Sequence, residues 1–183
     1  MTHEHEIRTE RHGPYTLRSA RRGDLERLIE LHLALQDHVE SSNADLWRMK
    51  RDARHNLRGQ VISRLGAVNS CALVAEHDED GVVGLIFGRI IINNRYTPSR
   101  AGQIDQAYVH PDHRRTGVGS RLVARLCAFF ASEGVEDISL RYVAGNDEAD
   151  SFWSAVGFSP RITTSGAHRQ EVEAQLARNC HHL

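Results

Sequence analysis

Residues 104–123 read Ile-Asp-Gln-Ala-Tyr-Val-His-Pro-Asp-His-Arg-Arg-Thr-Gly-Val-Gly-Ser-Arg-Leu-Val, and this stretch decides the fold. A strand ends at Val109, a polar loop carries Arg114 and Arg115, and Gly117 and Gly119 open a helix. Glycine lets backbone N–H groups converge on an anion, the helix N-terminus adds unpaired donors, and arginine adds charge-assisted hydrogen bonds. The stretch therefore predicts a phosphate site, with a pyrophosphate as the expected ligand.

Two common phosphate loops do not fit this stretch. A dinucleotide-binding Gly-x-Gly-x-x-Gly motif would need a third glycine where Leu122 stands, and it would follow the strand directly. A Walker A loop would need a Gly-Lys-Ser/Thr sequence, which is absent. The remaining alternative is structural, with Gly117 and Gly119 only turning the chain into a helix.

The rest of the chain alternates strand and helix patterns around this stretch. The expected strands are Tyr15–Ser19, Cys71–Ala75, Val82–Ile92, Gly102–Val109 and Ile138–Val143, with a weak one at Ile162–Thr164. One helix follows Asp24 as its cap, and the others run from about Ala44 to Leu65, Gly117 to Ser132, Asn146 to Val156 and His168 to Arg178. This order predicts an α/β or α+β fold, in which helices flank a mixed sheet.

Composition limits the class of protein. The 183 residues, 40% hydrophobic and 26% charged, suffice for one domain with a buried core. The 23 basic and 24 acidic residues nearly balance, so we expect no nucleic-acid partner. No apolar run is long enough for a membrane span and the polar N-terminus has no secretory pattern, so we expect a cytoplasmic protein with no membrane partner.

The cysteines and histidines predict neither disulfides nor a metal site. Cys71, Cys127 and Cys180 are widely spaced and odd in number, and the first two are expected to be buried free thiols. The twelve histidines include pairs near the two termini and His110 and His113 in the loop after the strand. None of these spacings is typical of a zinc site, so no metal is expected.

Two motifs in order resemble the GCN5-related N-acetyltransferase (GNAT) superfamily. The first is Tyr108-Val-His-Pro-x-x-Arg114-x-x-Gly117-x-Gly119, whose core matches the family's acetyl-CoA-binding pattern Arg/Gln-x-x-Gly-x-Gly/Ala. The second runs from Asn146 to Phe158 and is similar to the family's Asn-x-x-Ala-x-x-Phe-Tyr-x-x-x-Gly-Phe segment. The resemblance implies a mixed, mostly antiparallel central sheet of six to seven strands with flanking helices and a splayed strand pair.

The resemblance also implies where acetyl-CoA, the cosubstrate, would bind. The pyrophosphate would contact the loop and helix start, and the pantetheine would pair with the backbone of the preceding strand. A bulge in that strand would splay it from the next strand, Ile138–Val143, and so open the slot for the pantetheine. The implied cofactor-binding residues are Ala107, Tyr108, Val109, Arg114, Arg115, Thr116, Gly117, Val118, Gly119, Ser120, Asn146, Phe152 and Trp153.

The catalytic residues are less clearly marked. Trp153 stands where the family often has a tyrosine acid, and because indole is no useful acid, solvent, Tyr142 or no dedicated group would protonate the thiolate. Strand alternation puts Gln103, Asp105, Ala107 and Val109 on one face, which makes Asp105 the candidate catalytic base. Glu76 on a neighbouring strand is the next candidate, and a plain polar strand position is the alternative for Asp105.

The acceptor is expected to lie near the connection between the first two helices, Gln36–Asp45. Asp37, Glu40 and Asp45 would attract a cationic amine there and His38 would titrate near neutrality, whereas the structural alternative is a solvated loop.

The combined expectation is an N-acetyltransferase that transfers acetyl to a primary amine, a small molecule or a protein N-terminus, by direct attack in a ternary complex. The alternative is a non-catalytic acyl-CoA-binding or regulatory module of the same fold. We expect a flexible segment at 1–14, one acetyltransferase domain at 15–164, and a helical tail or arm at 165–183. A homodimer is expected, with the arm as a possible contact.

Overall fold

The chain forms two units, Met1–Asp150 and Ser151–Leu183, each described by itself below. The structure is a computed structural model that describes residues 8–42, 48–95 and 97–180.

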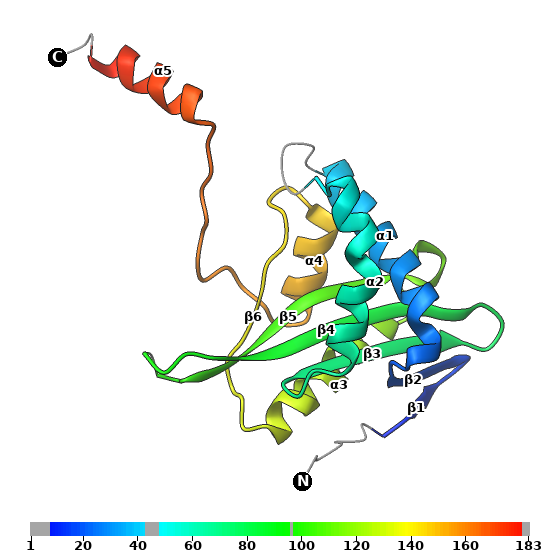
Figure 1. The fold of residues 1–183 in the computed structure, drawn as a ribbon. Helices are drawn as coiled ribbons and strands as arrows, with labels where there is room; N and C mark the ends of the chain where they lie inside the picture. Colours follow the sequence, from blue (N-terminus) through cyan, green and yellow to red (C-terminus); the bar gives the residue numbers. More distant parts are fainter. Residues whose placement is uncertain (1–7, 43–47, 96, 181–183) are drawn as a thin grey trace. The chain divides into compact units, whose positions relative to one another are not determined.

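The first unit is built on one six-stranded sheet whose strands follow one another in chain order (Figure 1). Every neighbouring pair is antiparallel except the last, β5 and β6, which is parallel. This confirms the expected mixed, mostly antiparallel sheet. The strands are β1 (Glu10–His12), β2 (Tyr15–Ser19), β3 (Ser70–His77), β4 (Gly81–Ile92), β5 (Arg100–Val109) and β6 (Ile138–Leu140).

Helices cover both faces of this sheet (Figure 1). On one face α1 (Leu25–Ser42) and α2 (Arg51–Leu65) bury apolar side chains against β3, β4 and β5. On the other face lies α3 (Val118–Ser132), which approaches β4 so closely that a Cβ on Gly88 would come within 2.8 Å of Leu126. Short 3-10 turns, η1 (Arg22–Asp24) and η2 (Pro111–His113), precede α1 and α3. No helix within the described ranges has both the length and the apolar character needed to cross a membrane.

The helical periodicity of α1 and α3 comes directly from the sequence. In α1 the residues Leu25, Leu28 and Leu31 are spaced three apart and are all buried. In α3 six apolar residues are buried, among them Leu122 and Phe130. Burying such a stripe stabilises each helix far more than its intrinsic propensity does.

Several element boundaries differ from the sequence expectation. Residues 10–12, expected in a flexible segment, form β1 and pair with β2. The second helix begins at Arg51, and residues 48–50 before it are not helical. The expected start near Ala44 lies outside the described residues. β6 is only three residues long, and no strand forms at 162–164. Asp24 does not cap α1 but ends η1, where its carboxylate accepts the backbone N–H of Arg21.

A buried ion cluster joins the start of α1 to the sheet. Arg18 on β2 is 7% exposed, and its guanidinium donates to Asp24 at 2.7 and 2.9 Å and to Glu76 on β3 at 2.7 Å. Burial opposes the ionisation of Asp24, but hydrogen bonds from Arg18 and Arg21 lower its pKa below the ordinary value. A buried cation needs such partners, so this cluster stabilises the fold only as long as it is complete.

Cys71 and Cys127 are free thiols, as expected. Cys71 on β3 is buried, and Cys127 on α3 is half-buried. Burial raises the pKa of Cys71 to about 12 and raises that of Cys127 as well, so neither is a reactive thiolate at neutral pH.

The second unit contains the end of α4 (Asp147–Ala155), a connecting segment and α5 (Arg169–Cys180). Trp153 is buried, and its ring lies edge-on to Phe152 at 4.9 Å and to Phe158 at 5.4 Å between centroids. On α5 the side chains of Val172 and Leu176 remain exposed.

Candidate functional site

The loop between β5 and α3 has the backbone of an anion-binding site. Arg115 has φ +60° and Gly117 has φ +84°, both in the left-handed region. Gly117 is the N-cap of α3, and no side chain caps the helix there. Left-handed residues turn successive N–H groups toward one side, and an uncapped helix N-terminus offers further donors. The geometry supports the phosphate site expected from the glycines.

The side chains of this loop divide into those that hold it and those that face solvent. Val118 is fully buried, so its side chain belongs to the core and not to the surface that a ligand would meet. The hydroxyl of Thr116 donates to the carbonyl of His113 at 2.8 Å and closes the loop. Arg115, Thr116, Gly117 and Ser120 are exposed, and Gly119 is half-exposed.

Strand β1 borders this loop, which the sequence did not indicate. Glu10 bridges Arg121 and Arg125 on α3 at 2.8 and 3.0 Å, and these bonds lower its pKa. The imidazole Nε2 of His12 lies 3.9 Å from the position that a Cβ on Gly117 would take. A histidine next to the uncapped helix start adds a group that can donate to an anion.

The parallel pair β5–β6 separates early, as the resemblance implied. The two strands pair only over residues 102–104 and 138–140, whereas β5 continues to Val109. Ala107 and Val109 therefore lie on the part of β5 that β6 does not cover. The side chain of Tyr108 belongs to the core on the side of α1 and α2, so the backbone is what this part of β5 offers to a ligand.

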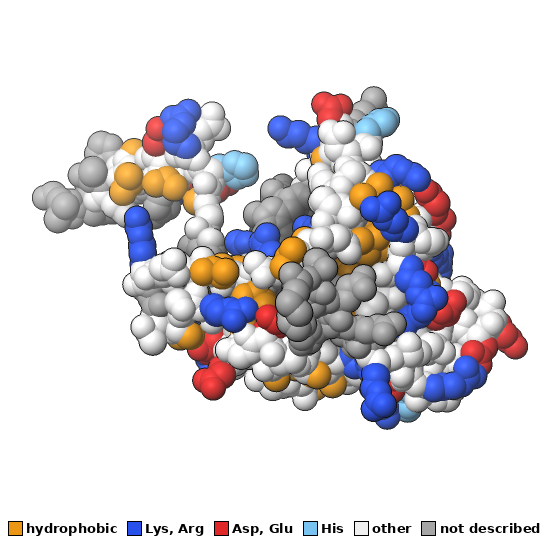
Figure 2. Space-filling model, turned by 60° about the horizontal axis from the view of Figure 1, so that its bottom comes forward, with side chains coloured by type: hydrophobic (Ala, Val, Ile, Leu, Met, Phe, Trp, Pro, Cys, Tyr) orange, Lys and Arg blue, Asp and Glu red, His pale blue; other side chains and the backbone are white. Residues whose placement is uncertain are grey.

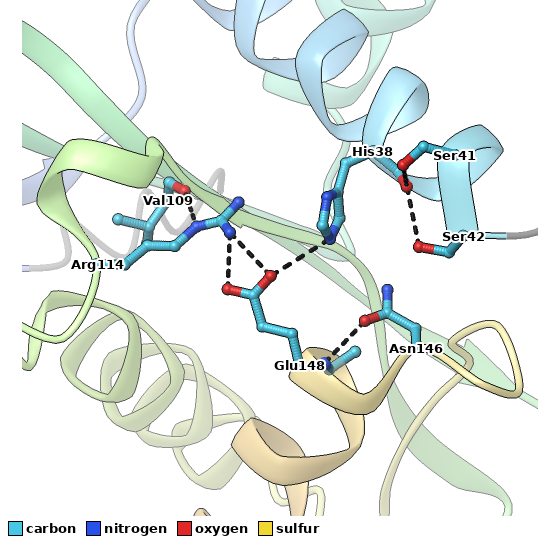
Figure 3. Close-up of polar contacts among 8 residues, drawn as sticks. His38, Ser41, Ser42, Val109, Arg114, Asn146 and Glu148 are labelled. Atoms are coloured by element: carbon cyan, nitrogen blue, oxygen red, sulfur yellow. Dashed lines mark hydrogen bonds and ion pairs between the residues drawn. The ribbon is translucent and has the colours of Figure 1, made fainter.

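An ion-paired cluster lies at the end of this part of β5 (Figure 3). Arg114 donates through Nε to the carbonyl of Val109 at 3.0 Å and through Nη1 to both carboxylate oxygens of Glu148 at 2.7 and 2.8 Å. His38 on α1 places its Nε2 3.5 Å from the same carboxylate. The guanidinium also lies 5.5 Å from the ring centre of Tyr108. The cluster links α1, the start of α4 and the loop between β5 and α3 (residues 110–117), called the phosphate loop below after its expected ligand.

These contacts change the expectation for Arg114. Its guanidinium is occupied by Glu148 and Val109, and its backbone N–H donates to the carbonyl of Pro111 at 3.1 Å. In this structure Arg114 therefore shapes the loop, while the open donors are those that follow it. The sequence could not reveal the partner Glu148, because that pairing joins residues 34 apart.

Asn146 has a structural task at the same place. It is 9% exposed, and its side-chain oxygen accepts the N–H of Ala149 at 3.0 Å, which caps the first turn of α4 (Figure 3). The cap fixes the helical turn that carries Glu148. Close by in sequence, Tyr142 donates to Asp150 at 2.5 Å, and this hydrogen bond raises the pKa of the phenol.

Two of the residues implied to bind the cofactor, Phe152 and Trp153, belong to the second unit. They contact each other there, and Trp153 also contacts Phe158, so the indole is a packed aromatic side chain. The geometry of each unit by itself leaves their contact with a cofactor a prediction.

The candidate base Asp105 lies at a β-bulge. The register between β4 and β5 shifts between Phe87 and Gly88, which leaves Asp105 as the extra residue. Its carboxylate accepts from Gln103 at 2.9 Å and lies 3.3 Å from Nε of Arg89. It is 12% exposed and lines a cavity of about 240 Å³ together with Arg64 on α2.

The bulge corrects the expectation based on strand alternation. Asp105 and Gln103 share a face, as their hydrogen bond requires. Ala107 and Val109 do not share it: Tyr108, between them, points to the α1 side, and Val109 lies near Leu122 of α3. The extra residue at the bulge reverses the parity of everything after it.

The second candidate base, Glu76, is not placed for this role. It lies on β3, which β4 separates from β5, and its carboxylate accepts from Arg18 at 2.7 Å. Its position next to the buried guanidinium of Arg18 makes it a structural residue.

The carboxylates expected to attract an amine also have partners. The segment from Gln36 to Ser42 is the last part of α1 rather than a loop. Asp37 pairs with Arg54 on α2 at 3.0 Å. Glu40 accepts the N–H of Met49 at 2.8 Å, which lowers its pKa. Asp37 thus joins the two helices, Glu40 holds the segment that precedes α2, and Asp45 lies outside the described residues.

Solved structures with the same fold come from several bacteria. A tetramutant of the BH1408 protein from Bacillus halodurans aligns with TM-score 0.73 at 16% identity, over 83% of this chain and 98% of that one. The aminoglycoside antibiotic 6'-N-acetyltransferase of Acinetobacter baumannii aligns with TM-score 0.66 at 14% identity, over 84% and 98%. A GCN5-related N-acetyltransferase from Ralstonia eutropha aligns with TM-score 0.66 at 22% identity, over 84% and 98%. At these identities the likeness establishes the fold alone.

A search of the curated proteins finds none that matches. The model of the acetyltransferase (GNAT) family, in contrast, matches residues 30–158, which include the phosphate loop, the splayed strand pair and the start of α4. Together with the fold, this match shows that the chain belongs to the GNAT family of acetyltransferases.

Proposed function

We propose that this chain is an acetyl-CoA-dependent N-acetyltransferase that acts on a primary amine by direct attack in a ternary complex. The observation that carries the proposal is the backbone of residues 115–119, where two left-handed residues lead into an uncapped helix beside a splayed strand. Membership of the GNAT family supports acetyl transfer in general.

The chain would hold acetyl-CoA mainly through its main chain. N–H groups from Gly117 to Ser120 would bind the pyrophosphate, and the backbone of Ala107 and Val109 would pair with the pantetheine in the place that β6 leaves. The carbonyl of Val109 now accepts from Arg114, so it would exchange this partner when the pantetheine binds.

Asp105 is the base that we propose for the amine. A primary amine with a pKa near 10 must lose a proton before it attacks the thioester. Gln103 and Arg89 fix the orientation of the carboxylate, and the adjoining cavity has room for the amine or for a relaying water. The amine nitrogen then forms the new bond to the acetyl carbon, the C–S bond breaks, and the CoA thiolate leaves.

No dedicated acid is required for the leaving thiolate. The indole of Trp153 cannot supply a proton, and the hydrogen bond to Asp150 makes the phenol of Tyr142 a weaker acid. Solvent would protonate the thiolate in this proposal.

The acceptor would be a small-molecule amine or a protein N-terminus rather than nucleic acid or membrane. On the face shown in Figure 2, basic and acidic side chains are intermixed instead of forming a basic stripe. The proposal also places the protein in the cytoplasm.

The test is release of CoA thiol from acetyl-CoA in the presence of a panel of primary amines. Thiol release that depends on one amine, with the acetylated amine seen by mass spectrometry, supports the enzyme. CoA binding in calorimetry without turnover on any amine would favour the alternative, a non-catalytic acyl-CoA-binding module, and absence of CoA binding would overturn both.

A homodimer is also part of this proposal, with 165–183 as the arm. Val172 and Leu176 lie four residues apart on α5 and are 45% and 58% exposed, as expected for a segment that needs a partner. A chain truncated after 164 should be a monomer by light scattering. A truncated chain whose particle mass is still twice that of one chain would exclude the arm as the contact.

A further inference from the structure

Two histidines and an aspartate form a cluster where the end of β3, the turn to β4 and η2 meet. His77 ends β3, Asp80 lies in the turn to β4, and His113 ends η2. Nδ1 of His77 lies 2.9 Å, and Nε2 of His113 3.4 Å, from the same carboxylate oxygen of Asp80. All three candidate ligand atoms lie within 4.8 Å of one another.

Both imidazoles pack against the ring of Tyr15. Their side chains are 16% and 11% exposed, and both rings contact the buried ring of Tyr15, at 5.1 Å from His77 and 5.8 Å from His113. The Tyr15 hydroxyl lies 3.1 Å from Nδ1 of His113. A hydrogen bond to one ring nitrogen fixes the tautomer and directs the other nitrogen outward, as is usual behind metal-binding histidines.

The turn at His77 leaves Nδ1 of this imidazole beside Asp80. The main-chain N–H groups of Glu79 and Asp80 lie 3.4 Å from Nδ1, so an unprotonated Nδ1 accepts from them only at long range. The carboxylate oxygen of Asp80 is nearer, at 2.9 Å, a separation that places either a proton on Nδ1 or a cation between the two atoms. An ion shared by Nδ1 and the carboxylate would replace the two long N–H contacts.

The donor set and spacing suit a transition metal. Zn²⁺ takes imidazole nitrogen and carboxylate oxygen at about 2.0–2.2 Å in a tetrahedron, which places neighbouring ligand atoms roughly 3.3 Å apart. The separations of 2.9 and 3.4 Å lie on either side of that value. Asp80 is 56% exposed, so an ion could enter from solvent and keep a water ligand.

We propose that His77, Asp80 and His113 bind one divalent transition-metal ion, with zinc as the reference ion and water completing its coordination. The ion would tie the β3–β4 turn to η2. Because the carbonyl of His113 also accepts a hydrogen bond from the Thr116 hydroxyl, the bound ion would fix the start of the phosphate loop. The role is structural, and it could not be predicted from the sequence because His77 ends β3 whereas His113 ends η2.

The test measures metal binding by the full chain after treatment with a chelator. Calorimetry with Zn²⁺ and the visible spectrum with Co²⁺ compare the wild type with His77→Gln and Asp80→Asn. The matched control is His110→Gln, since His110 lies in the same loop but faces Asp112 instead. Asp80 is exposed, so Asp80→Asn is expected to fold even if His77→Gln does not.

One Zn²⁺ per chain is expected in the wild type and in His110→Gln, with affinity at least tenfold lower in His77→Gln and Asp80→Asn. The Co²⁺ spectrum should show the intense bands of a tetrahedral site only in the first two proteins. Equal Zn²⁺ affinity in the wild type and Asp80→Asn, or no binding in the wild type, would overturn the proposal. The readout needs neither acetyl-CoA nor activity, so failure of the proposed function would leave it unaffected.

Discussion

Replacing Gly117 by alanine tests the phosphate loop most directly. At φ +84° a residue with a Cβ is strained by about 1–2 kcal/mol. Among the described residues, the new methyl group meets no atom nearer than the His12 imidazole nitrogen at 3.9 Å, so the protein should fold. The strain turns the adjacent N–H groups away from their common side, and the Cβ enters the space in front of the loop.

The expected loss follows from the hydrogen bond that is removed. One backbone hydrogen bond to a charged phosphate is worth about 1.5–3 kcal/mol, which weakens CoA binding by roughly 10- to 150-fold. Calorimetry with CoA measures this loss, and urea unfolding measures the strain.

Gly134→Ala is the matched control for Gly117→Ala. Gly134 also has a positive φ, +68°, and open space around its Cβ position, but it lies at the opposite end of α3. Both variants should lose similar stability, and only Gly117→Ala should lose CoA affinity. Unchanged CoA affinity in a folded Gly117→Ala protein would refute the assignment of the loop.

Three further predictions concern the base, the buried ion cluster and the indole. Asp105→Asn should lower kcat/KM by roughly 10²–10⁴-fold without changing CoA affinity, whereas the control Asp52→Asn on α2 should leave both quantities unchanged. Normal turnover of Asp105→Asn across the pH range would exclude Asp105 as the base. Asp24→Asn should destabilise the fold by about 3–5 kcal/mol in urea unfolding because Arg18 loses its buried partner. Because the folded-state pKa of Asp24 is lowered, that contribution is present at neutral pH and disappears as the pH falls through the folded-state pKa, so the variant and wild type should converge in acid. Trp153→Phe should lower CoA affinity and leave the pH dependence of kcat unchanged, and a changed pH limb would show that the indole takes part in proton transfer.

The regular elements were predictable because their periodicity is local. The stripes of α1 and α3 and the continuous apolar run of β4 follow from residue spacing, and they determine the two helical layers. The turn from β5 into α3 was predictable for the same reason, since its glycines are contiguous in sequence, whereas phosphate binding there stays a prediction.

The side-chain partners of the site were not predictable, because they depend on contacts between distant segments. Nothing in the residues around Asp105 marks the extra residue of a bulge, and a period of two carried through it assigned Ala107 to the wrong face. The residues around Arg114 do not reveal its pairing with Glu148, and contact of its guanidinium with phosphate stays a prediction. Glu76 reads as an available acid until Arg18 is seen beside it.

The agreement between strand order and chain order has a consequence for how the molecule folds. The antiparallel run β3–β4–β5 joins neighbours in sequence through short connections, so its pairing needs little loop closure. The parallel strand β6 can join only after α3 has crossed the sheet, which costs more chain entropy and is slow. We therefore expect the antiparallel strands to form the folding nucleus and β6 to dock late. The slot for acetyl-CoA would then open at the seam between the part of the sheet that forms first and the strand that arrives last.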